Sequence, residues 1–481
     1  MPEPVPPPPD NPPPVRSLRT ETAAEDRVPV AQKLAIAAGE ISSIGRQSVD
    51  NLALPFYNVA LGVSPVLVTA VLSIARLLDA FTDPLAGSIS DNTHTRWGRR
   101  KPFLLVASIV CGLTLPLVWM PGRGWTEIQC FAYFFVTLLL YFGVYSFFNV
   151  PLIALALEAT PDYKERTRVV AYKGLVVQGM GILGSWLFAI TQLDFFHDTI
   201  HGARWIGLGM GLLVMVTGLI PVILVREGYR KIAVAKKRMP FWQGVRVTFM
   251  NRSFVLLSVI AMGAKMSGPL VQALGLYILI YFVYGGDLKA AAKTAGLFGT
   301  VLQLATIACL PVVTYLANRW GKIRALEICL WILIVGSFSK WFTYKPEHPY
   351  YIVVTAVLIA PGQAAFFAII RSIIADICDA DELQTGMRRE GMYGAMHSWI
   401  EKALGSLAVL LTGTVIVAVG FHQEAGANQT PHALVMMRAA FVIIPVVAVS
   451  LALLALRYFP LTPARTFEIR QELERRRGTT R

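Results

Sequence analysis

Charged residues are scarce in this chain: Asp, Glu, Lys and Arg make up 15% of its 481 residues, whereas hydrophobic residues make up 55%. A soluble protein of this length needs far more polar side chains to cover its core. The composition therefore excludes an ordinary soluble enzyme or binding domain. Most of the chain must lie in membrane lipid.

Several patterns that mark an enzyme are missing. The five cysteines stand singly, without CxxC or another metal-ligand spacing, at Cys111, Cys130, Cys309, Cys329 and Cys378. No nucleotide-binding loop or ATPase signature is present, and no apolar segment carries a nucleophile with a nearby base. We therefore expect no enzymatic activity and no cofactor apart from a coupling ion.

A cleavable signal is missing as well, because the first residues, MPEPVPPPPDNPPPVRS, are polar and rich in proline. We expect residues 1–30 to form a disordered cytosolic tail. Two glycine clusters, GMGILG from Gly179 and GLGMG from Gly207, have a spacing that favours close packing of helices.

The chain contains many long apolar segments. A bilayer core about 30 Å thick needs a helix of roughly 20 residues, and the sequence supplies twelve such spans. Their limits are 34–62, 65–90, 103–121, 127–158, 167–191, 204–226, 252–283, 291–317, 323–343, 349–378, 391–419 and 434–458.

The cations fall in alternate loops between these spans. The formal net charge is +14, and clusters such as Arg96–Lys101, Arg319–Arg324 and Arg388–Arg389 alternate with loops that have few cations. Because cytoplasmic loops retain positive charge, we expect these loops and both termini in the cytosol. Membrane topology explains the positive charge, so we expect no nucleic-acid partner.

The two halves of the chain resemble each other. RWGRRK from Arg96 recurs as RWGKIR from Arg319, and EATPDYKERTR from Glu158 is echoed by DADELQTGMRR from Asp379, both at a separation of about 220 residues. Two landmarks with one offset indicate duplication. We expect an all-α membrane protein with twelve transmembrane helices in two six-helix bundles. The expected divisions are a tail 1–30, a bundle 31–226, a linker 227–251, a bundle 252–460 and a basic cytosolic tail 461–481.

Three charges interrupt the second span. Arg76, Asp79 and Asp83 lie three and four residues apart, which places them near one face of a helix. A carboxylate at the centre of a membrane helix costs about 2.5 to 3.5 kcal/mol, and two nearby carboxylates repel each other, which favours a bound cation or a proton. In the alternative interpretation, Arg76 neutralises one aspartate in a structural ion pair.

Three segments carry a resemblance to a known family. DAFTDPLAGSISDNTHTRWGRRKPF from Asp79, YSFFNVPLIALALEATPDYKERTR from Tyr145 and ADICDADELQTGMRREGMYGAMHSWIEKALG from Ala375 resemble the glycoside/pentoside/hexuronide:cation symporters, a branch of the major facilitator superfamily. The resemblance covers the membrane portion of the chain. It implies transport of a small polar solute together with a cation, by alternating access around a site at mid-membrane.

The resemblance also implies roles for single residues. Asp79 and Asp83 match the carboxylate pair that coordinates the coupling cation, so they would be the metal ligands if that cation is Na⁺. Arg76 matches a basic residue one turn before this pair, and Lys402 matches a lysine that supports the same polar centre. Lys173 lies about where a family member has a basic residue facing the sugar.

Two positions depart from the sugar-binding pattern of the family. Asn149 stands where some members have a carboxylate, and it also offers an oxygen ligand for Na⁺. The carboxylate expected on the first span falls near Ser43, with Asp50 about two turns further on. We expect Asp50 and Asn149 to contact the solute together with Lys173 and Lys402. The sequence leaves the choice between Na⁺ and H⁺ open.

A second group of charges lies near the cytosolic ends of the spans. We expect a charge network of Arg371, Asp376, Glu158 and Arg76. As a hypothesis, Asp91, Arg99 and Arg100 form half of a cytoplasmic gate. The alternative is that these loop charges only set the topology.

The sequence thus predicts a cation-coupled symporter of a sugar, glycoside or related solute. We expect a monomeric multi-pass protein of the bacterial inner membrane, whose partners are the solute, the cation and membrane lipid. Two alternatives are a carrier of an amphipathic solute, favoured by the apolar residues Leu152 and Ile153, and a membrane sensor that has lost transport.

Overall fold

The computed structural model describes residues 26–93, 95–160, 162–225, 241–386, 389–422, 425–426 and 428–476. The side chains of 163–164, 241–245 and 264–271 lie outside this description. Within the described ranges the secondary structure is helical, apart from one isolated bridge between Thr95 and Gly98. Most of the expected tail 1–30 and about half of the expected linker 227–251 lie outside the described residues.

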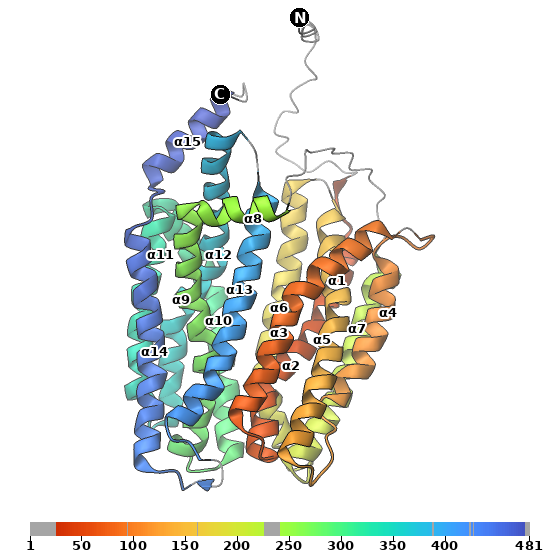
Figure 1. Cartoon of the computed structure of the whole chain (residues 1–481), viewed down its shortest axis with the longest axis vertical. Coiled ribbons are helices and arrows are strands. Elements are labelled where there is room, and N and C mark those ends of the chain that lie inside the picture. Colours follow the sequence, from red (N-terminus) through yellow and green to blue (C-terminus); the bar gives the residue numbers. More distant parts are fainter. Residues whose placement is uncertain are drawn as a thin grey trace, which may run out of the picture.

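Figure 1 shows two bundles of helices side by side, with the last described helix, α15, at the upper end. The helices of the first bundle are α1 (Val30–Gly39), η2 (Glu40–Ser42), α2 (Ser43–Ala53), η3 (Leu54–Ala60), α3 (Pro65–Asn92), α4 (Lys101–Leu117), α5 (Glu127–Glu158), α6 (Tyr163–Thr191) and α7 (Thr199–Leu224). The first expected span is therefore interrupted by a 3-10 turn, η2, and ends in a π-helical stretch, η3.

The second bundle follows a short helix, α8 (Phe241–Met250), which crosses the upper end in Figure 1. Its helices are α9 (Arg252–Tyr277), η4 (Ile278–Val283), α10 (Leu288–Trp320), α11 (Lys322–Thr343), η5 (Pro349–Tyr351), α12 (Ile352–Thr385), α13 (Glu390–Ala418), α14 (Pro431–Arg457) and α15 (Pro463–Arg476).

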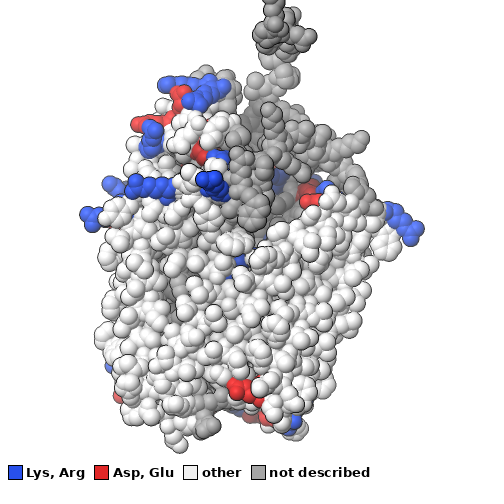
Figure 2. Space-filling view, in the orientation of Figure 1, with Lys and Arg blue, Asp and Glu red and all other residues white. Residues whose placement is uncertain are grey.

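Nine of the described helices are long and apolar enough to cross a membrane. Three further apolar helical stretches are shorter, at Lys101–Leu117, Arg252–Gly263 and Gln272–Val283. In Figure 2, charged side chains gather at the upper and lower ends of the visible face, and the band between is almost free of them. This distribution suits a bilayer around the middle of the molecule. The exact number of twelve spans stays a prediction.

The helix boundaries follow from local sequence. The side chains of Asp162, Asp287 and Thr430 cap α6, α10 and α14 by accepting a hydrogen bond from a backbone N–H in the first turn. Between α10 and α11 the chain turns at Gly321 alone, with φ +89°. A side chain there would be strained, because L residues rarely adopt this conformation.

Close packing joins α4 to α7 in the first bundle. A Cβ atom on Gly211 would lie 2.4 Å from the carbonyl oxygen of Gly112, and one on Gly207 would lie 2.4 Å from the ring of Trp119. Only glycine allows the helix backbones to approach so closely. The packing role expected for the cluster from Gly207 is therefore confirmed.

The two bundles contact each other through the lower parts of their helices. Trp186 Nε1 donates to Thr300 Oγ1 at 2.8 Å, which joins α6 to α10. The hydroxyl groups of Ser73 and Ser406 lie 2.8 Å apart and join α3 to α13. Further hydrogen bonds link Gln272 to Asn51 and Tyr277 to Asn58, each at 2.5 Å. The lower end of the molecule is therefore closed.

Candidate functional site

A cavity of about 670 Å³ lies between the two bundles. From the first bundle, α2, η3, α3 and α6 line it, and from the second α9 to α14 do so. Its wall is largely apolar, with a small number of charged and amide side chains. This size and composition are typical of a site for a small organic molecule.

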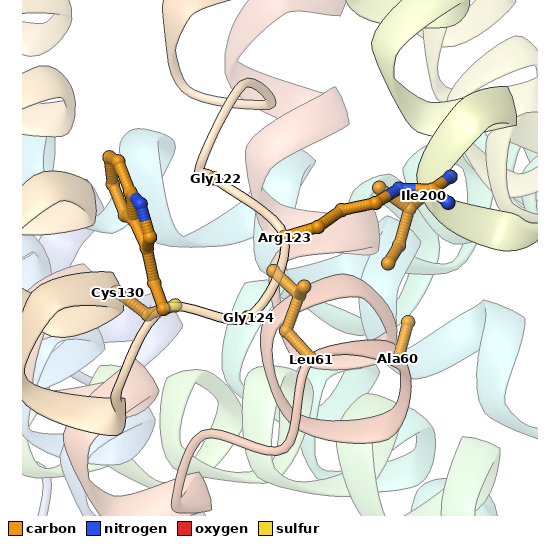
Figure 3. Close-up of a pocket in the computed structure, with 8 residues that line it drawn as sticks. Ala60, Leu61, Gly122, Arg123, Gly124, Cys130 and Ile200 are labelled. Carbon is orange, nitrogen blue, oxygen red and sulfur yellow. The ribbon is translucent and has the colours of Figure 1, made fainter.

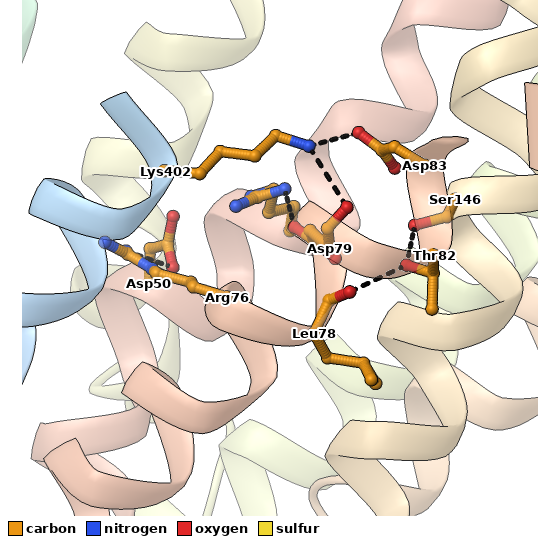
Figure 4. A network of polar contacts seen from close by, with 9 residues as sticks. Asp50, Arg76, Leu78, Asp79, Thr82, Asp83, Ser146 and Lys402 are labelled. Carbon is orange, nitrogen blue, oxygen red and sulfur yellow. Dashed lines mark hydrogen bonds and ion pairs between the residues drawn. The ribbon is translucent and has the colours of Figure 1, made fainter. Parts of the chain in front are cut away.

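Three ion pairs include residues that line this cavity, and Figure 4 shows them from close by. Arg46 Nη1 on α2 lies 2.7 Å from Asp79 Oδ2 on α3, and Arg76 Nη2 on α3 lies 2.7 Å from Asp50 Oδ1 on α2. Lys402 Nζ, which comes from α13 of the second bundle, pairs with Asp83. The same ammonium group also lies 3.4 Å from the carbonyl oxygen of Asp79.

The structure differs here from the simplest interpretation of the sequence. Arg76 does not neutralise an aspartate of its own helix in this structure; its ion pair is with Asp50, while Arg46 and Lys402 pair with Asp79 and Asp83. Arg46 is therefore a member of the site that sequence reasoning missed. Its position four residues before Asp50, on one face of α2, was the available signal.

Of the three carboxylates in these ion pairs, Asp50, Asp79 and Asp83, Asp79 is the most deeply buried, with 2% of its surface exposed. Its Oδ2 atom accepts from Arg46, and its Oδ1 atom has no hydrogen-bond partner among the described residues. A buried oxygen without a partner is costly and usually has a functional reason. This oxygen is available to a proton or a small cation.

Two hydroxyl groups lie next to the aspartates. Thr82 Oγ1 on α3 and Ser146 Oγ on α5 are 2.8 Å apart, and Thr82 also donates to the carbonyl oxygen of Leu78 (Figure 4). Sequence reasoning missed both hydroxyls. It selected Asn149, which lies three residues after Ser146; in the described structure Asn149 makes no hydrogen bond to either aspartate and does not line the cavity. Its predicted roles gain no support from this arrangement.

Lys173 is placed away from the cavity. Its ammonium group lies 2.7 Å from Glu40 Oε1, and the two side chains are 13% and 11% exposed. Glu40 belongs to the 3-10 turn η2, so this pair fastens α6 to the interruption of the first span. Lys173 does not line the cavity, and its predicted contact with the solute is not seen in this conformation.

The residues of the expected cytoplasmic gate meet at the upper end of the first bundle. Arg100 pairs with Asp91 and, at 3.0 Å, with Glu158; Arg99 lies 2.8 Å from the other oxygen of Glu158. Asp91 lies at the end of α3, Arg99 and Arg100 lie just before α4, and Glu158 is the last residue of α5. In this conformation the described ion pairs therefore connect helices within one bundle and do not bridge to the other.

The equivalent group in the second bundle is centred on Asp376. Lys322 Nζ lies 2.5 Å from one of its oxygens, and Arg470 Nη2 of α15 lies 2.8 Å from the other. Arg371, which we expected in the same charge network as Asp376, is exposed and forms no ion pair within the described part of the chain. Five residues along a helix separate two side chains by well over a quarter turn, which keeps them apart.

A second hollow lies in the first bundle, beside the end of η3 (Figure 3). It has a volume of about 300 Å³ and is lined by loop residues and by the end of the first span. Its single cation, Arg123, lies 2.7 Å from Asp198 and is thus already paired. The hollow offers no further charged group, so the central cavity is the stronger candidate.

The arrangement is similar to that of solved transporter structures. A bacterial homologue of the human lysosomal transporter Spinster, in an inward-facing and unoccupied conformation, superposes with a TM-score of 0.67 and 16% identity, over 90% of this chain and 98% of that chain. This likeness establishes the fold of a helical membrane transporter.

Sequence comparison assigns the family. The profile described as "MFS/sugar transport protein" matches residues 46–463, and the chain belongs to this family. It is 24% identical to the uncharacterized symporter YnaJ of Bacillus subtilis (strain 168), over 94% of this chain and 96% of the relative. It is also 24% identical to the isoprimeverose transporter of Lactiplantibacillus pentosus, over 84% and 83%. The protein is therefore an integral membrane transporter and not an enzyme, as the sequence predicted.

Proposed function

We propose that this protein is a symporter that moves a sugar, a glycoside or a related polar solute together with a small cation. The observation that carries the proposal is the pairing of Lys402, from the second bundle, with Asp83, beside the buried Asp79 at the edge of the cavity. Family membership and the names of the relatives, a sugar transporter and a symporter, agree with it.

The coupling step follows from the electrostatics of this group. A cation or proton that binds at Asp83 competes with the ammonium group of Lys402, since both need the same carboxylate oxygens. Because α3 and α13 belong to different bundles, release of Lys402 weakens a link between the bundles and favours their movement. The unpaired Oδ1 of Asp79 and the hydroxyls of Thr82 and Ser146 supply further oxygens for Na⁺.

Both coupling ions remain part of the proposal. A proton needs only one of the carboxylates, whereas Na⁺ needs several oxygen ligands. Within the described residues no cluster of three or more His, Cys, Asp or Glu could hold a metal. A Na⁺ site would therefore depend on hydroxyl and carbonyl oxygens in addition to Asp79 and Asp83.

The upper end of the molecule is assigned to the cytosol. The cation-rich loops of the sequence begin or end the helices there, as the positive-inside rule requires. The cross-bundle hydrogen bonds lie in the lower parts of the helices, so the conformation is closed toward the outside. We assign the Arg99, Arg100, Asp91 and Glu158 cluster to a gate that regroups when the cytosolic end closes.

The solute is placed in the central cavity, where Asp50, Arg76 and Lys402 are exposed to it. Leu152 is 1% exposed and would contact a Cβ atom built on Gly39, and neither Leu152 nor Ile153 lines the cavity. The apolar character of these two positions thus no longer favours a carrier of amphipathic molecules.

Reconstituted vesicles test the proposal. The purified protein in liposomes is given an inward gradient of Na⁺ or of H⁺, and uptake of labelled monosaccharides, disaccharides and glycosides is measured. The expected result is accumulation of at least one solute above equilibrium with one of the two gradients and collapse of accumulation when an ionophore removes that gradient. Uptake that never exceeds equilibrium with either ion would contradict symport, even if the solute crosses.

A further inference from the structure

The outer surface of the second bundle carries two exposed arginines at its cytosolic end. Arg324 lies in the first turn of α11, and Arg457 is the last residue of α14. Neither side chain forms an ion pair or a hydrogen bond within the described part of the chain. In Figure 1 both helices lie at the left edge of the molecule, and Figure 2 shows cations along the upper edge of the uncharged band on that side. These two charges therefore face the surroundings of the protein.

The two arginines lie at the same height on neighbouring helices. α11 and α14 pack side by side and run in opposite directions. Lys340 of α11 lies over the ring of Phe441 of α14, at 4.6 Å from its centroid, which fixes the register of the pair. Arg324 is 16 residues before Lys340, and Arg457 follows Phe441 by the same number. Because both helices rise equally per residue, the two arginines reach one level, on axes about 8 to 10 Å apart.

Below the arginines, the same two helices expose a strip of apolar side chains. In the same register the strip consists of three rungs, each with one side chain from α11 and one from α14: Trp331 with Leu451, Val335 with Val447, and Phe338 with Ile443. All six side chains are at least half exposed. The distance from Arg324 down to Phe338 is about 21 Å along α11, which matches one leaflet of a bilayer with its headgroups. The surface thus has the length and the polarity of a phospholipid.

The surroundings of the two arginines suit an anionic headgroup. Trp320 at the end of α10 and Tyr458 just after α14 are 46% and 59% exposed, and such side chains are enriched at the membrane interface. The first turn of α11 has no acidic residue and no side-chain cap, so its backbone N–H groups also favour an anion. Glu327, one turn below Arg324, is exposed. Two arginines and this one carboxylate leave the surface with a net positive charge.

Membrane topology alone does not account for this arrangement. In the corresponding helix pair of the first bundle, α4 and α7, Lys101 stands at the position of Arg324 in the repeat, and the last turn of α7 has no cation. We propose that the α11–α14 surface binds an anionic phospholipid of the cytosolic leaflet, with its phosphate between Arg324 and Arg457 and an acyl chain along the apolar strip. A phosphate accepts hydrogen bonds from both guanidinium groups and supplies the charge that they lack. The inference concerns membrane lipid and goes beyond the proposed transport function.

Brominated lipids test the site on the full-length protein in nanodiscs. Bromine quenches tryptophan fluorescence on contact, and Trp331, two turns below Arg324, reports from the strip. Phosphatidylcholine discs contain the same mole fraction of chain-brominated phosphatidylglycerol or of chain-brominated phosphatidylcholine, and the part of the quenching that Trp331→Phe removes is compared. We expect phosphatidylglycerol to occupy the site about tenfold more strongly, since each arginine near an anionic headgroup adds about fivefold and Glu327 opposes them.

Charge variants assign this preference to the two arginines. Arg324→Gln and Arg457→Gln should each lower the preference to about two- to threefold, and the double variant should lower it to about onefold. Arg96→Gln, which removes an exposed cation from the corresponding loop of the first bundle, should leave it unchanged. Glu327→Gln should raise it, because the carboxylate repels the phosphate. All four positions are exposed, so melting temperatures in pure phosphatidylcholine discs should change little.

Several outcomes would overturn the lipid site. Equal quenching by the two brominated lipids, or a preference that survives in the double variant, contradicts it directly. An equal loss of preference in Arg96→Gln would show that only the overall charge of the cytosolic end matters. Inorganic phosphate at matched ionic strength should not displace the lipid, because the strip holds the acyl chain; displacement would indicate a site for a soluble anion instead. A large fall in the melting temperature of the double variant would assign the arginines a structural role.

Discussion

Lys402 on α13 and Asp83 on α3 form an ion pair that joins the two bundles beside the central cavity. The two side chains are 25% and 24% exposed, and Lys402 lines the cavity. A charge that binds on one side of this pair therefore acts directly on a contact between the two moving parts of the proposed transporter.

Asp83→Asn should abolish coupling without abolishing binding of the solute. The amide cannot hold a proton or a cation as the carboxylate does, so the gradient can no longer drive accumulation. We expect the accumulation ratio in vesicles to fall to about one, while exchange of solute across the membrane continues. Glu347→Gln, at an exposed loop position, is the matched control. Full gradient-driven accumulation in Asp83→Asn would remove Asp83 from the coupling site.

Lys402→Ala should raise the apparent affinity for the coupling cation. The ammonium group competes for Asp83, and two unit charges about 4 Å apart interact by up to about 4 kcal/mol near a protein surface. We expect the half-saturating cation concentration in uptake assays to fall by about tenfold or more. Lys402→Arg keeps the charge and should keep most of the normal cation dependence. An unchanged dependence in Lys402→Ala would reduce the residue to a packing role.

The sequence predicted the charged face of α3 but not its partners. Spacings of three and four residues place Arg76, Asp79 and Asp83 together because the helix repeat is local. Arg46 and Lys402 come from other helices, and which cation meets which aspartate depends on how the bundles pack. The alternative interpretation, in which Arg76 neutralises an aspartate of its own helix, considered one helix at a time, whereas the structure pairs Arg76 with Asp50.

The same limit explains the other differences. Lys173 forms an ion pair with Glu40, which lies in the 3-10 turn that interrupts the first span. Nothing in the pattern of apolar residues predicts that turn. Arg470 pairs with Asp376 because α15, whose buried residues are Ile469 and Leu473, packs against α12. The sequence predicted only a basic cytosolic tail for this segment. The fold class and the apolar spans could be predicted, because they depend on composition and on the length of apolar segments, and both can be read directly from the sequence.

Arg46→Gln should destabilise the protein through Asp79. The carboxylate is 2% exposed and would lose Arg46, its only ion-pair partner among the described residues. Breaking a buried ion pair from one side costs about 3 to 5 kcal/mol, and we expect about 2 to 4 here because the side chain of Arg46 is 30% exposed. Thermal unfolding in detergent measures the loss. The double variant Arg46→Gln/Asp79→Asn should recover part of it, and no recovery would contradict a direct coupling between the two residues.

Arg470→Gln should loosen α15 without changing the rest of the fold. The variant removes one of two partners of Asp376, and the arginine side chain is 53% exposed, so we expect a cost of about 1 kcal/mol or less. Limited proteolysis near residues 457–463 should become faster. Arg465→Gln, which loses only a pair with Glu468 on its own helix, is the control. Equal cleavage rates in the two variants would show that Arg470 does not hold α15.

Asp194→Asn should remove a link at the lower end of the molecule. Lys289 Nζ lies 2.5 Å from Asp194 Oδ1 and joins the loop after α6 to the start of α10. The hydrogen bond from Lys289 and its charge lower the pKa of Asp194 below the ordinary value. A lowered pKa in the folded state means that the link is fully present above the ordinary pKa of about 4 and is lost as the pH falls through the lowered value. We therefore expect this link to contribute no pH dependence between pH 5 and 8.

The measurement compares wild type with Asp194→Asn in nanodiscs by thermal unfolding from pH 3 to pH 7. The melting temperatures should differ by a small constant amount above pH 5, in favour of the wild type, and should converge below pH 4 because protonated Asp194 resembles asparagine. Lys289→Gln should reproduce the Asp194→Asn values above pH 5, since each variant removes the same link. A difference that grows as the pH falls would contradict the sign of the pKa shift.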